Sequence, residues 1–214
     1  MRGAYSDSVI SGLYGVTADA PDTPFLLEQV EAALAGGARV IQYRNKSAPL
    51  TARLEQGRAL KALCVRYAVP LIVNDYIDLA RAIDADGVHL GAGDGSALAA
   101  RHALGAGRIL GVSCYDSLER GREAQRDGAD YVAFGSFFPS SVKPDAVHAP
   151  LDLLAEAKRE LALPLVAIGG ITLANAQDLI TAGADALAVI TALFAAADIT
   201  AAARDFEALF GSRP

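Results

Sequence analysis

Gly128-Ala129-Asp130-Tyr131-Val132-Ala133-Phe134-Gly135 is the stretch that decides the fold. Its centre, residues 131–134, is a run of aromatic, β-branched and small residues, which is typical of a parallel strand buried on both faces. Related triplets stand between a helical segment and a strand at Gly37-Ala38-Arg39, Ala85-Asp86-Gly87 and Gly183-Ala184-Asp185. A triplet that returns at about every fourth element favours a closed, quasi-symmetric sheet over an open one.

Outward from this stretch, short apolar strands alternate with helical segments along the chain. The expected strands are 13–17, 40–44, 71–73, 88–90, 109–113, 131–134, 165–168 and 186–190. The expected helices are about 24–35, 51–68, 77–83, 96–104, 118–127, 151–161, 174–182 and 199–210. Thr23 is expected to be the N-cap of the first helix, because Pro24 suits the first helical position.

Eight strand–helix alternations without a linker predict an α/β fold, a single (β/α)8 TIM barrel with parallel strands. One domain would cover residues 1–214, with residues 1–11 as a loose N-terminal extension. The alternative is a doubly wound open sheet. No Gly-x-Gly-x-x-Gly follows the first strand, which argues against a dinucleotide-binding version of that fold.

Composition excludes several classes of partner. The net charge of the 214 residues is -6 and no basic run occurs, which argues against nucleic acid and anionic membranes. The sequence contains no run of about 18 apolar residues, so no membrane span is expected. Two cysteines, Cys64 and Cys114, are too few for a disulfide framework, so a reduced cytoplasmic setting is expected. A homodimer is compatible with the sequence, but no heptad pattern requires one.

The barrel prediction locates the chemistry, because such barrels carry their functional residues where the strands end at the C-terminal face. The residues there are Gln42, Arg44, Lys46, Asn74, Asp75, Asp94, Ser113, Ser140, Lys143, Gly169, Gly170, Ile190 and Thr191. Polar residues concentrate at this one rim, which is hard to explain in a purely structural protein.

Two kinds of subsite follow from these residues. Gly169-Gly170 and Ile190-Thr191 stand where barrels commonly bind a phosphate, although a glycine pair can also simply form a tight turn. The second subsite combines three cations with two carboxylates: Arg44, Lys46 and Lys143 with Asp75 and Asp94. These could be plain ion pairs, or they could bind a pyrophosphate–Mg²⁺ complex, which needs carboxylates on the metal and cations on the remaining oxygens. No Cys/His cluster has zinc spacing.

Seven segments on consecutive predicted strands resemble the motifs of the thiamine-phosphate synthase family, over about residues 14–194. They are Gln42-Tyr43-Arg44-Asn45-Lys46, Leu71-Ile72-Val73-Asn74-Asp75, Gly87-Val88-His89-Leu90-Gly91, Gly111-Val112-Ser113, the segment from Phe134 to Lys143, Ala167-Ile168-Gly169-Gly170-Ile171 and Val189-Ile190-Thr191. Each is short, but their joint order is specific.

The resemblance implies a transferase that joins (4-amino-2-methyl-5-pyrimidinyl)methyl diphosphate to a thiazole phosphate. Gln42, Arg44, Lys46, Asn74 and Lys143 would contact the pyrimidine diphosphate. Asp75 and Asp94 would hold Mg²⁺. The other implied roles are Ser113 beside the aminopyrimidine, Ser140, Val142, Gly169, Gly170, Ile190 and Thr191 at the thiazole phosphate, and Lys143, Arg44 and Ser113 as the catalytic residues.

The chain departs from the family in the loop after residue 138. The family pattern Pro-Thr-x-Thr-Lys is here Pro139-Ser140-Ser141-Val142-Lys143, so Val142 lacks the hydroxyl that a phosphate oxygen would accept from. Among the histidines, His89 is expected to be packed and hydrogen-bonded inside a strand, and His102 and His148 to be solvated. None of the three is assigned a catalytic role.

Two other functions remain open from the residues. One is a thiazole tautomerase, a related barrel that needs a proton-transfer residue and no diphosphate–Mg²⁺ subsite. The other is a barrel that binds a phosphorylated metabolite without turnover.

Overall fold

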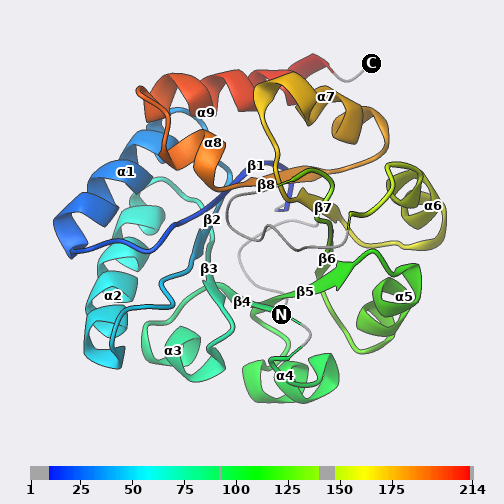
Figure 1. Ribbon diagram of the computed structural model, residues 1–214. Coiled ribbons are helices and arrows are strands. Elements are labelled where there is room, and N and C mark those ends of the chain that lie inside the picture. The colour runs from blue at the N-terminus through cyan, green and yellow to red at the C-terminus, as the bar shows by residue number, and fades with distance from the viewer. Residues whose placement is uncertain (1–9, 92, 140–147, 213–214) are drawn as a thin grey trace.

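The fold is a closed barrel of eight parallel strands surrounded by helices, as the sequence predicts (Figure 1). The computed structural model describes residues 10–91, 93–139 and 148–212. The strands are β1 (Gly12–Val16), β2 (Val40–Tyr43), β3 (Leu71–Asn74), β4 (Gly87–Leu90), β5 (Ile109–Tyr115), β6 (Tyr131–Phe134), β7 (Leu165–Ile168) and β8 (Ala186–Val189). They pair in chain order, and β8 closes the barrel on β1 with Tyr14 opposite Ala188.

The helices connect consecutive strands and form the outer ring (Figure 1). They are α1 (Thr23–Ala35), α2 (Leu50–Arg66), α3 (Ile77–Ala82), α4 (Ala97–Leu104), α5 (Leu118–Arg126), α6 (Asp152–Glu160), α7 (Leu173–Thr181), α8 (Thr191–Phe194), α9 (Ile199–Ala208) and the 3-10 turn η1 (Leu209–Ser212). None of the helices among the described residues is long and apolar enough to cross a membrane.

Three local predictions need correction. The N-cap of α1 is Asp22 rather than Thr23, because the Asp22 carboxylate accepts a hydrogen bond from the Phe25 amide at 2.9 Å. Strand β5 continues past Ser113 to Tyr115, where the pairing with β6 shifts register. The short helix α8 follows β8 directly and was not among the expected elements.

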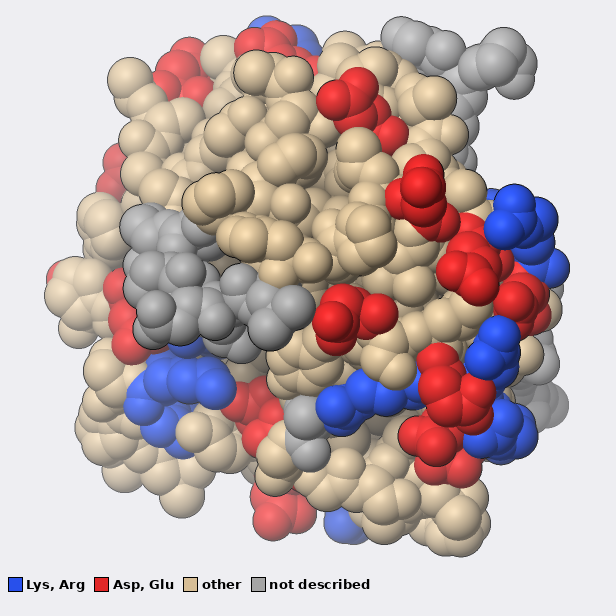
Figure 2. Space-filling model, turned by 45° about the vertical axis from the view of Figure 1, so that its right-hand side comes forward, with Lys and Arg blue, Asp and Glu red and all other residues tan. Residues whose placement is uncertain are grey.

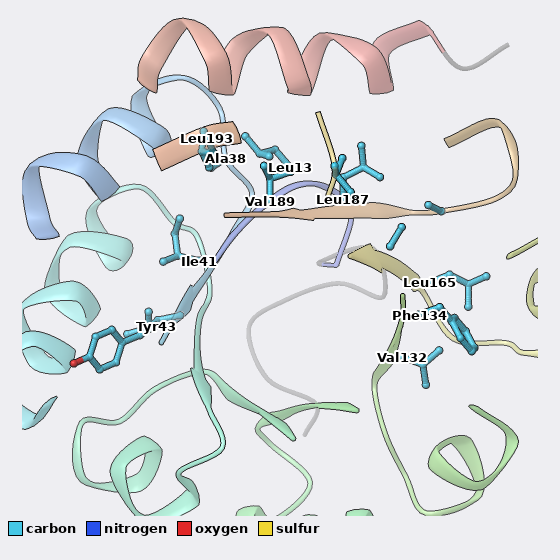
Figure 3. Close-up of a cluster of buried hydrophobic side chains, with 14 of the residues drawn as sticks. Leu13, Ala38, Ile41, Tyr43, Val132, Phe134, Leu165, Leu187, Val189 and Leu193 are labelled. Atoms are coloured by element: carbon cyan, nitrogen blue, oxygen red, sulfur yellow. The ribbon is translucent and has the colours of Figure 1, made fainter. Parts of the chain in front are cut away.

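The side chains of each strand alternate between two apolar cores, as expected for a barrel. One set faces the helices and forms the larger core, for example Leu13, Ile41 and Phe134 (Figure 3). The other set fills the barrel interior and is drawn almost entirely from strands. Ile10 joins that interior core and is 5% exposed. Of the loose extension predicted for residues 1–11, the structure describes only residues 10 and 11; residues 1–9 lie outside the described part.

The repeated triplets serve the N-terminal face of the barrel. In three of them the aspartate accepts a backbone N–H of the neighbouring odd strand and pairs with a cation of a helix. The amide bonds are Leu71 to Asp86 at 2.9 Å, Leu110 to Asp130 at 2.7 Å and Leu165 to Asp185 at 2.9 Å. The cations are Lys61, Arg101 and Lys158, respectively.

In the fourth triplet the acceptor for the strand amide comes from a different element. Arg39 stands where the others have aspartate, and Glu207 of α9 supplies the carboxylate that accepts from the Leu13 amide at 2.9 Å. Arg39 then pairs with Glu207. The repeat therefore satisfies strand amides opposite the functional rim, which explains its spacing without any role in chemistry.

Charged side chains of both signs are interspersed on the face shown in Figure 2. Elsewhere in the described chain, as on this face, charges of opposite sign are close; Arg122, for example, pairs with Glu119 and Glu160. This distribution fits the net charge of -6.

We expect Gly111→Ala to destabilise the barrel by about 3 kcal/mol, the upper end of what overpacking costs. A Cβ at Gly111 would overlap the Tyr131 ring, which lies inside the barrel and is fully buried. Urea unfolding measures the change. Gly107→Ala is the matched control, because a Cβ at Gly107 meets nothing within 4 Å. Equal stability of the two variants would contradict the prediction.

Candidate functional site

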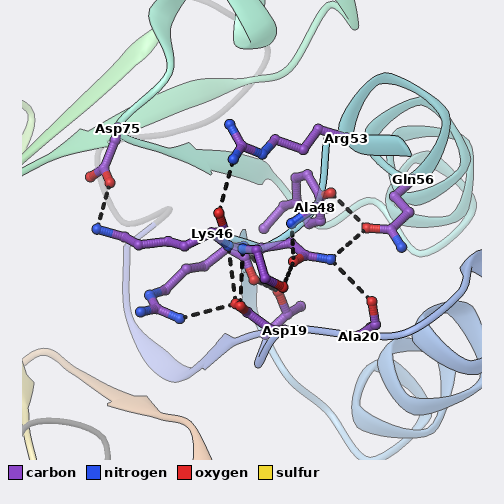
Figure 4. Close-up of polar contacts among 12 residues, drawn as sticks. Asp19, Ala20, Lys46, Ala48, Arg53, Gln56 and Asp75 are labelled. Carbon is purple, nitrogen blue, oxygen red and sulfur yellow. Dashed lines mark hydrogen bonds and ion pairs between the residues drawn. The ribbon is translucent and has the colours of Figure 1, made fainter. Parts of the chain in front are cut away.

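The segment after β2 carries two of the predicted cations, and its shape is set by one aspartate. Asp19 follows β1 and accepts hydrogen bonds from the backbone amides of Lys46 at 3.0 Å and Ser47 at 3.1 Å (Figure 4). The Arg44 guanidinium lies 3.4 Å from the same carboxylate. Asp19 therefore fixes both the backbone and one cation of this segment.

The charge on Asp19 is secured by these contacts. Burial alone would raise the pKa of Asp19, but the hydrogen bonds from Lys46 and Ser47 outweigh it and hold that pKa below its usual value. The carboxylate is thus ionised at neutral pH.

Further hydrogen bonds hold the segment against α2 (Figure 4). The Asn45 amide nitrogen donates to the Ala20 carbonyl at 3.2 Å and to Gln56 Oε1 at 3.0 Å, and Asn45 is buried. Arg53 donates to the Lys46 carbonyl at 3.0 Å, and its guanidinium carbon lies 4.3 Å from the centre of the Tyr76 ring. These contacts leave the Lys46 and Arg44 side chains on a fixed backbone.

The predicted carboxylates lie together and next to one of these cations. Lys46 Nζ is 3.0 Å from Asp75 Oδ2 (Figure 4). Burial raises the pKa of Asp94, and a hydrogen bond with Asp75 raises it further. Asp94 also accepts from the Gly91 amide at 2.7 Å. Two carboxylates this close repel each other when both are ionised, so the arrangement suits a cation between them.

The backbone at Asp75 is unusual. Its φ is 65°, in the left-handed region that non-glycine residues seldom adopt, and its amide donates to the His89 carbonyl at 2.9 Å. Strained conformations of this kind are found preferentially where a side chain must be aimed at a ligand. Asn74, which ends β3, has the same inward alternation as Ile72 and so faces the barrel interior.

A separate cavity of about 300 Å³ opens between the ends of β7 and β8. Gly169, Gly170, Ile190 and Thr191, all predicted from the sequence, line it together with Pro139. The lining includes glycine backbone at one end and the start of α8 at the other.

The glycine pair has a steric reason as well. Both residues have positive φ, 103° at Gly169 and 62° at Gly170. A Cβ on Gly169 would overlap Ser136, and one on Gly170 would overlap the carbonyls of Phe138 and Pro139. The turn explanation therefore applies to both glycines, and the bare backbone also leaves space that an anion could approach.

A family model described as thiamine monophosphate synthase matches residues 13–193. The chain belongs to the thiamine-phosphate synthase family. The matched range contains every residue predicted for the site. As a member of this family, the chain is a transferase of thiamine biosynthesis.

Individual relatives agree with the family. A thiamine-phosphate synthase of Thiobacillus denitrificans is 55% identical over 203 residues, 95% of this chain and 96% of that sequence. One of Methylobacillus flagellatus is 58% identical over 201 residues, 94% of this chain and 96% of that sequence. The structure of a thiamine phosphate pyrophosphorylase from Pyrococcus furiosus superposes with a TM-score of 0.85 at 35% identity, covering 96% of this chain and 97% of that chain.

The tertiary structure thus brings most predicted residues to one end of the barrel. Arg44, Lys46, Asp75 and Asp94 form one group, and the glycine-lined cavity forms another. The predictions for Ser140, Val142 and Lys143 lie outside the described residues. His102 and His148 are exposed, as expected.

Sequence reasoning missed Asp19. A signal was present, since Asp19 follows the first strand at the same rim as the other predicted residues. Its partners, however, are backbone amides of Lys46 and Ser47, and only the folded chain shows that it braces them.

We expect Asp19→Asn to raise the KM for a diphosphate substrate about tenfold, with a smaller change in kcat. Asparagine removes the charge beside Arg44 and can no longer accept both amide protons with two carboxylate oxygens. Steady-state kinetics with each substrate varied separately measures the effect. Asp22→Asn is the control, because asparagine caps a helix as well as aspartate. Equal KM values in both variants would show that Asp19 does not brace the cations.

Proposed function

We propose that the chain joins (4-amino-2-methyl-5-pyrimidinyl)methyl diphosphate to a thiazole phosphate, giving thiamine monophosphate and pyrophosphate. A thiazole that carries a carboxylate would also release CO₂. The observation that carries this proposal is the group formed by Lys46, Asp75 and Asp94 beside Arg44, at the rim of a barrel of this family. A leaving diphosphate needs cations and a metal site in one place, and this group supplies both kinds of residue.

The diphosphate half is assigned to the β2 segment. Arg44 and Lys46 would neutralise negative charge on the diphosphate, with Lys143 joining them from the loop after β6. Cations stabilise the leaving group most when they are already positioned before the reaction. The hydrogen bonds made by Asp19, Asn45 and the α2 side chains hold the backbone that carries Arg44 and Lys46 in place. Simple ion pairs, the alternative left open by the sequence, describe the same contacts without substrate. When substrate binds, Lys46 would leave Asp75 and contact a phosphate oxygen.

Asp75 and Asp94 fit Mg²⁺. The ion prefers hard oxygen ligands and is commonly held by one or two carboxylates, with water and substrate phosphate completing its shell. The raised pKa of Asp94 beside Asp75 is what a pair awaiting a cation would show. Among the described residues no group of three or more His, Cys, Asp or Glu could hold a metal, so a dedicated protein cage is not what supports the proposal. When bound, Mg²⁺ would supply charge neutralisation on the leaving group.

The thiazole phosphate is assigned to the cavity between β7 and β8. Gly169 and Gly170 offer backbone that an anion can approach, and Ile190 and Thr191 close the other side. Pro139 at its edge begins the loop that continues to Ser140 and Val142. A phosphate held there would direct the thiazole ring toward the diphosphate group across the same rim.

The proposed reaction needs little general acid–base catalysis from the protein. The thiazole nitrogen is a neutral nucleophile with a free lone pair, so no general base is demanded. The hard step is breaking the bond between the methylene carbon and the diphosphate oxygen, because negative charge collects on the leaving group. Positioned cations lower that barrier, and holding the two rings in line removes most of the entropic cost of their meeting.

The test is to mix the purified protein with both substrates, with and without Mg²⁺, and to measure pyrophosphate and thiamine monophosphate. Release is expected only when both substrates and Mg²⁺ are present. A thiazole tautomerase would change the thiazole partner alone, and a binding barrel would bind substrates without release. No pyrophosphate under any condition would refute the proposal.

We further infer a cytoplasmic location, which the substrates' phosphate charges and the two unpaired cysteines support. A homodimer remains a prediction, which analytical ultracentrifugation tests directly.

A further inference from the structure

Five polar side chains from five strands form a continuous series of hydrogen bonds across the barrel interior, here called the interior relay. Gln42 Nε2 donates to the Tyr14 hydroxyl at 2.8 Å, and the Tyr14 and Tyr131 hydroxyls are 2.7 Å apart. His89 Nδ1 lies 2.9 Å from the Tyr131 hydroxyl, and His89 Nε2 lies 2.8 Å from Ser113 Oγ. The relay thus links Gln42 and Ser113, two predicted substrate-binding residues on different strands.

The relay is almost entirely removed from water. The exposed fractions are 1% for Tyr14, 0% for Tyr131, 5% for Gln42 and 8% for His89. The imidazole also stacks on the Tyr131 ring, with centroids 5.5 Å apart and planes 24° from parallel. Polar groups buried to this degree are costly unless every one is bonded, so the geometry of the relay is closely specified.

With the Gln42 amide nitrogen directed at the Tyr14 hydroxyl, the hydrogen bonds of the relay admit one direction in which every buried proton has an acceptor. Burial raises the pKa of both Tyr14 and Tyr131 well above the ordinary value, so each phenol keeps its proton. The Gln42 nitrogen only donates, so the Tyr14 proton goes to the Tyr131 oxygen. In this direction the Tyr131 proton goes to His89 Nδ1, which acts as the acceptor.

The direction determines the state of the imidazole. A neutral ring with a bare Nδ1 carries its proton on Nε2. That Nε2–H points at Ser113 Oγ, so the serine oxygen accepts from His89 and keeps its own proton for another partner.

We propose that His89 is a positioning residue that fixes Ser113 as a hydrogen-bond donor to the substrate. This inference rests on the proposed function, in which Ser113 lies beside the aminopyrimidine. A serine presented in this way suits an acceptor, so Ser113 would bind a ring nitrogen of the pyrimidine rather than its amino group. The relay also ties Ser113 to Gln42, which keeps two contacts to the same substrate in register.

The tautomer can be measured without any substrate. The chain has three histidines, and in ¹⁵N-histidine-labelled protein the signals of His89 are those lost in His89→Gln. The expected state is a neutral ring protonated at Nε2. In Tyr131→Phe, which removes the donor to Nδ1, the tautomer should shift toward Nδ1–H. A charged ring or an Nδ1–H ring in the wild type would overturn the proposal.

Kinetics test the action on Ser113. Glutamine can place an N–H where Nε2 stands, whereas the shorter asparagine reaches only the Tyr131 side. We expect His89→Asn to raise the KM for the pyrimidine diphosphate about tenfold, the upper range for one hydrogen bond, with the KM for the thiazole phosphate unchanged. His89→Gln should recover most of the loss. The control variant is His102→Gln, because His102 is exposed.

A double-mutant cycle separates positioning from general support of the fold. If His89 acts through Ser113, His89→Asn should change the KM for the pyrimidine diphosphate by less than about twofold in a Ser113→Ala background. An undiminished effect there would refute the proposal. Should His89→Asn fail to fold, Tyr131→Phe replaces it in the same cycle. Failure of the wild type to release pyrophosphate would instead refute the proposed function and leave the tautomer result standing.

Discussion

Replacement of Asp94 by asparagine is expected to lower the rate of pyrophosphate release about a thousandfold at a fixed Mg²⁺ concentration, equivalent to about 4 kcal/mol of barrier. The asparagine side-chain oxygen could still accept from the Gly91 amide, so the local turn should survive. What disappears is one of two adjacent carboxylates, and with it half of the protein's proposed contribution to the metal site.

Calorimetric titration with Mg²⁺ in the presence of pyrophosphate gives a readout that needs no turnover. The Asp94→Asn protein should show at least about a tenfold weaker Mg²⁺ affinity, since a neutral amide is a poorer ligand for a hard cation. Asp205→Asn is the control, because Asp205 is an exposed carboxylate on α9. Wild-type affinity and turnover in Asp94→Asn would remove this residue from the metal site.

The second large effect is expected at Lys143. Lys143→Ala should lose at least about a hundredfold in turnover, because one positioned donor on a developing negative charge is worth about 3 to 4 kcal/mol. The loss should fall on kcat more than on KM, since the charge that Lys143 meets is greatest in the transition state.

Single-turnover measurements separate this effect from product release. Lys158→Ala is the matched control, because Lys158 pairs with Asp185 at the opposite face of the barrel. It should alter stability slightly and turnover not at all. A turnover of Lys143→Ala within about threefold of the wild type would show that this lysine does not stabilise the leaving group.

Much of the fold follows from local sequence. Runs such as Leu71-Ile72-Val73 are apolar without alternation, which requires a strand covered on both sides, and the eight alternations leave room for little but a barrel. The errors occur where local signals compete. Asp22 and Thr23 are both good N-caps, and the choice between them depends on which side chain reaches the Phe25 amide.

The candidate site divides in the same way. Reading the strand ends supplied Arg44, Lys46, Asp75 and Asp94, because parallel strands must deliver their C-terminal ends to one rim. The structure then showed which of these touch: Lys46 meets Asp75, and Asp94 adjoins Asp75. Distances of this kind depend on the stagger of the barrel and on backbone conformations such as the positive φ at Asp75.

The sequence by itself determined the barrel and its family, because these depend on periodicity and on short motifs in a fixed order, and it proposed which residues lie at the rim. Only the tertiary structure shows that Tyr14, Tyr131 and His89 are hydrogen-bonded in series. Each is an ordinary strand residue in isolation, and they meet only because the closed barrel turns every second side chain inward. Asp19 belongs with them, since the amides it accepts from are 27 and 28 residues away along the chain.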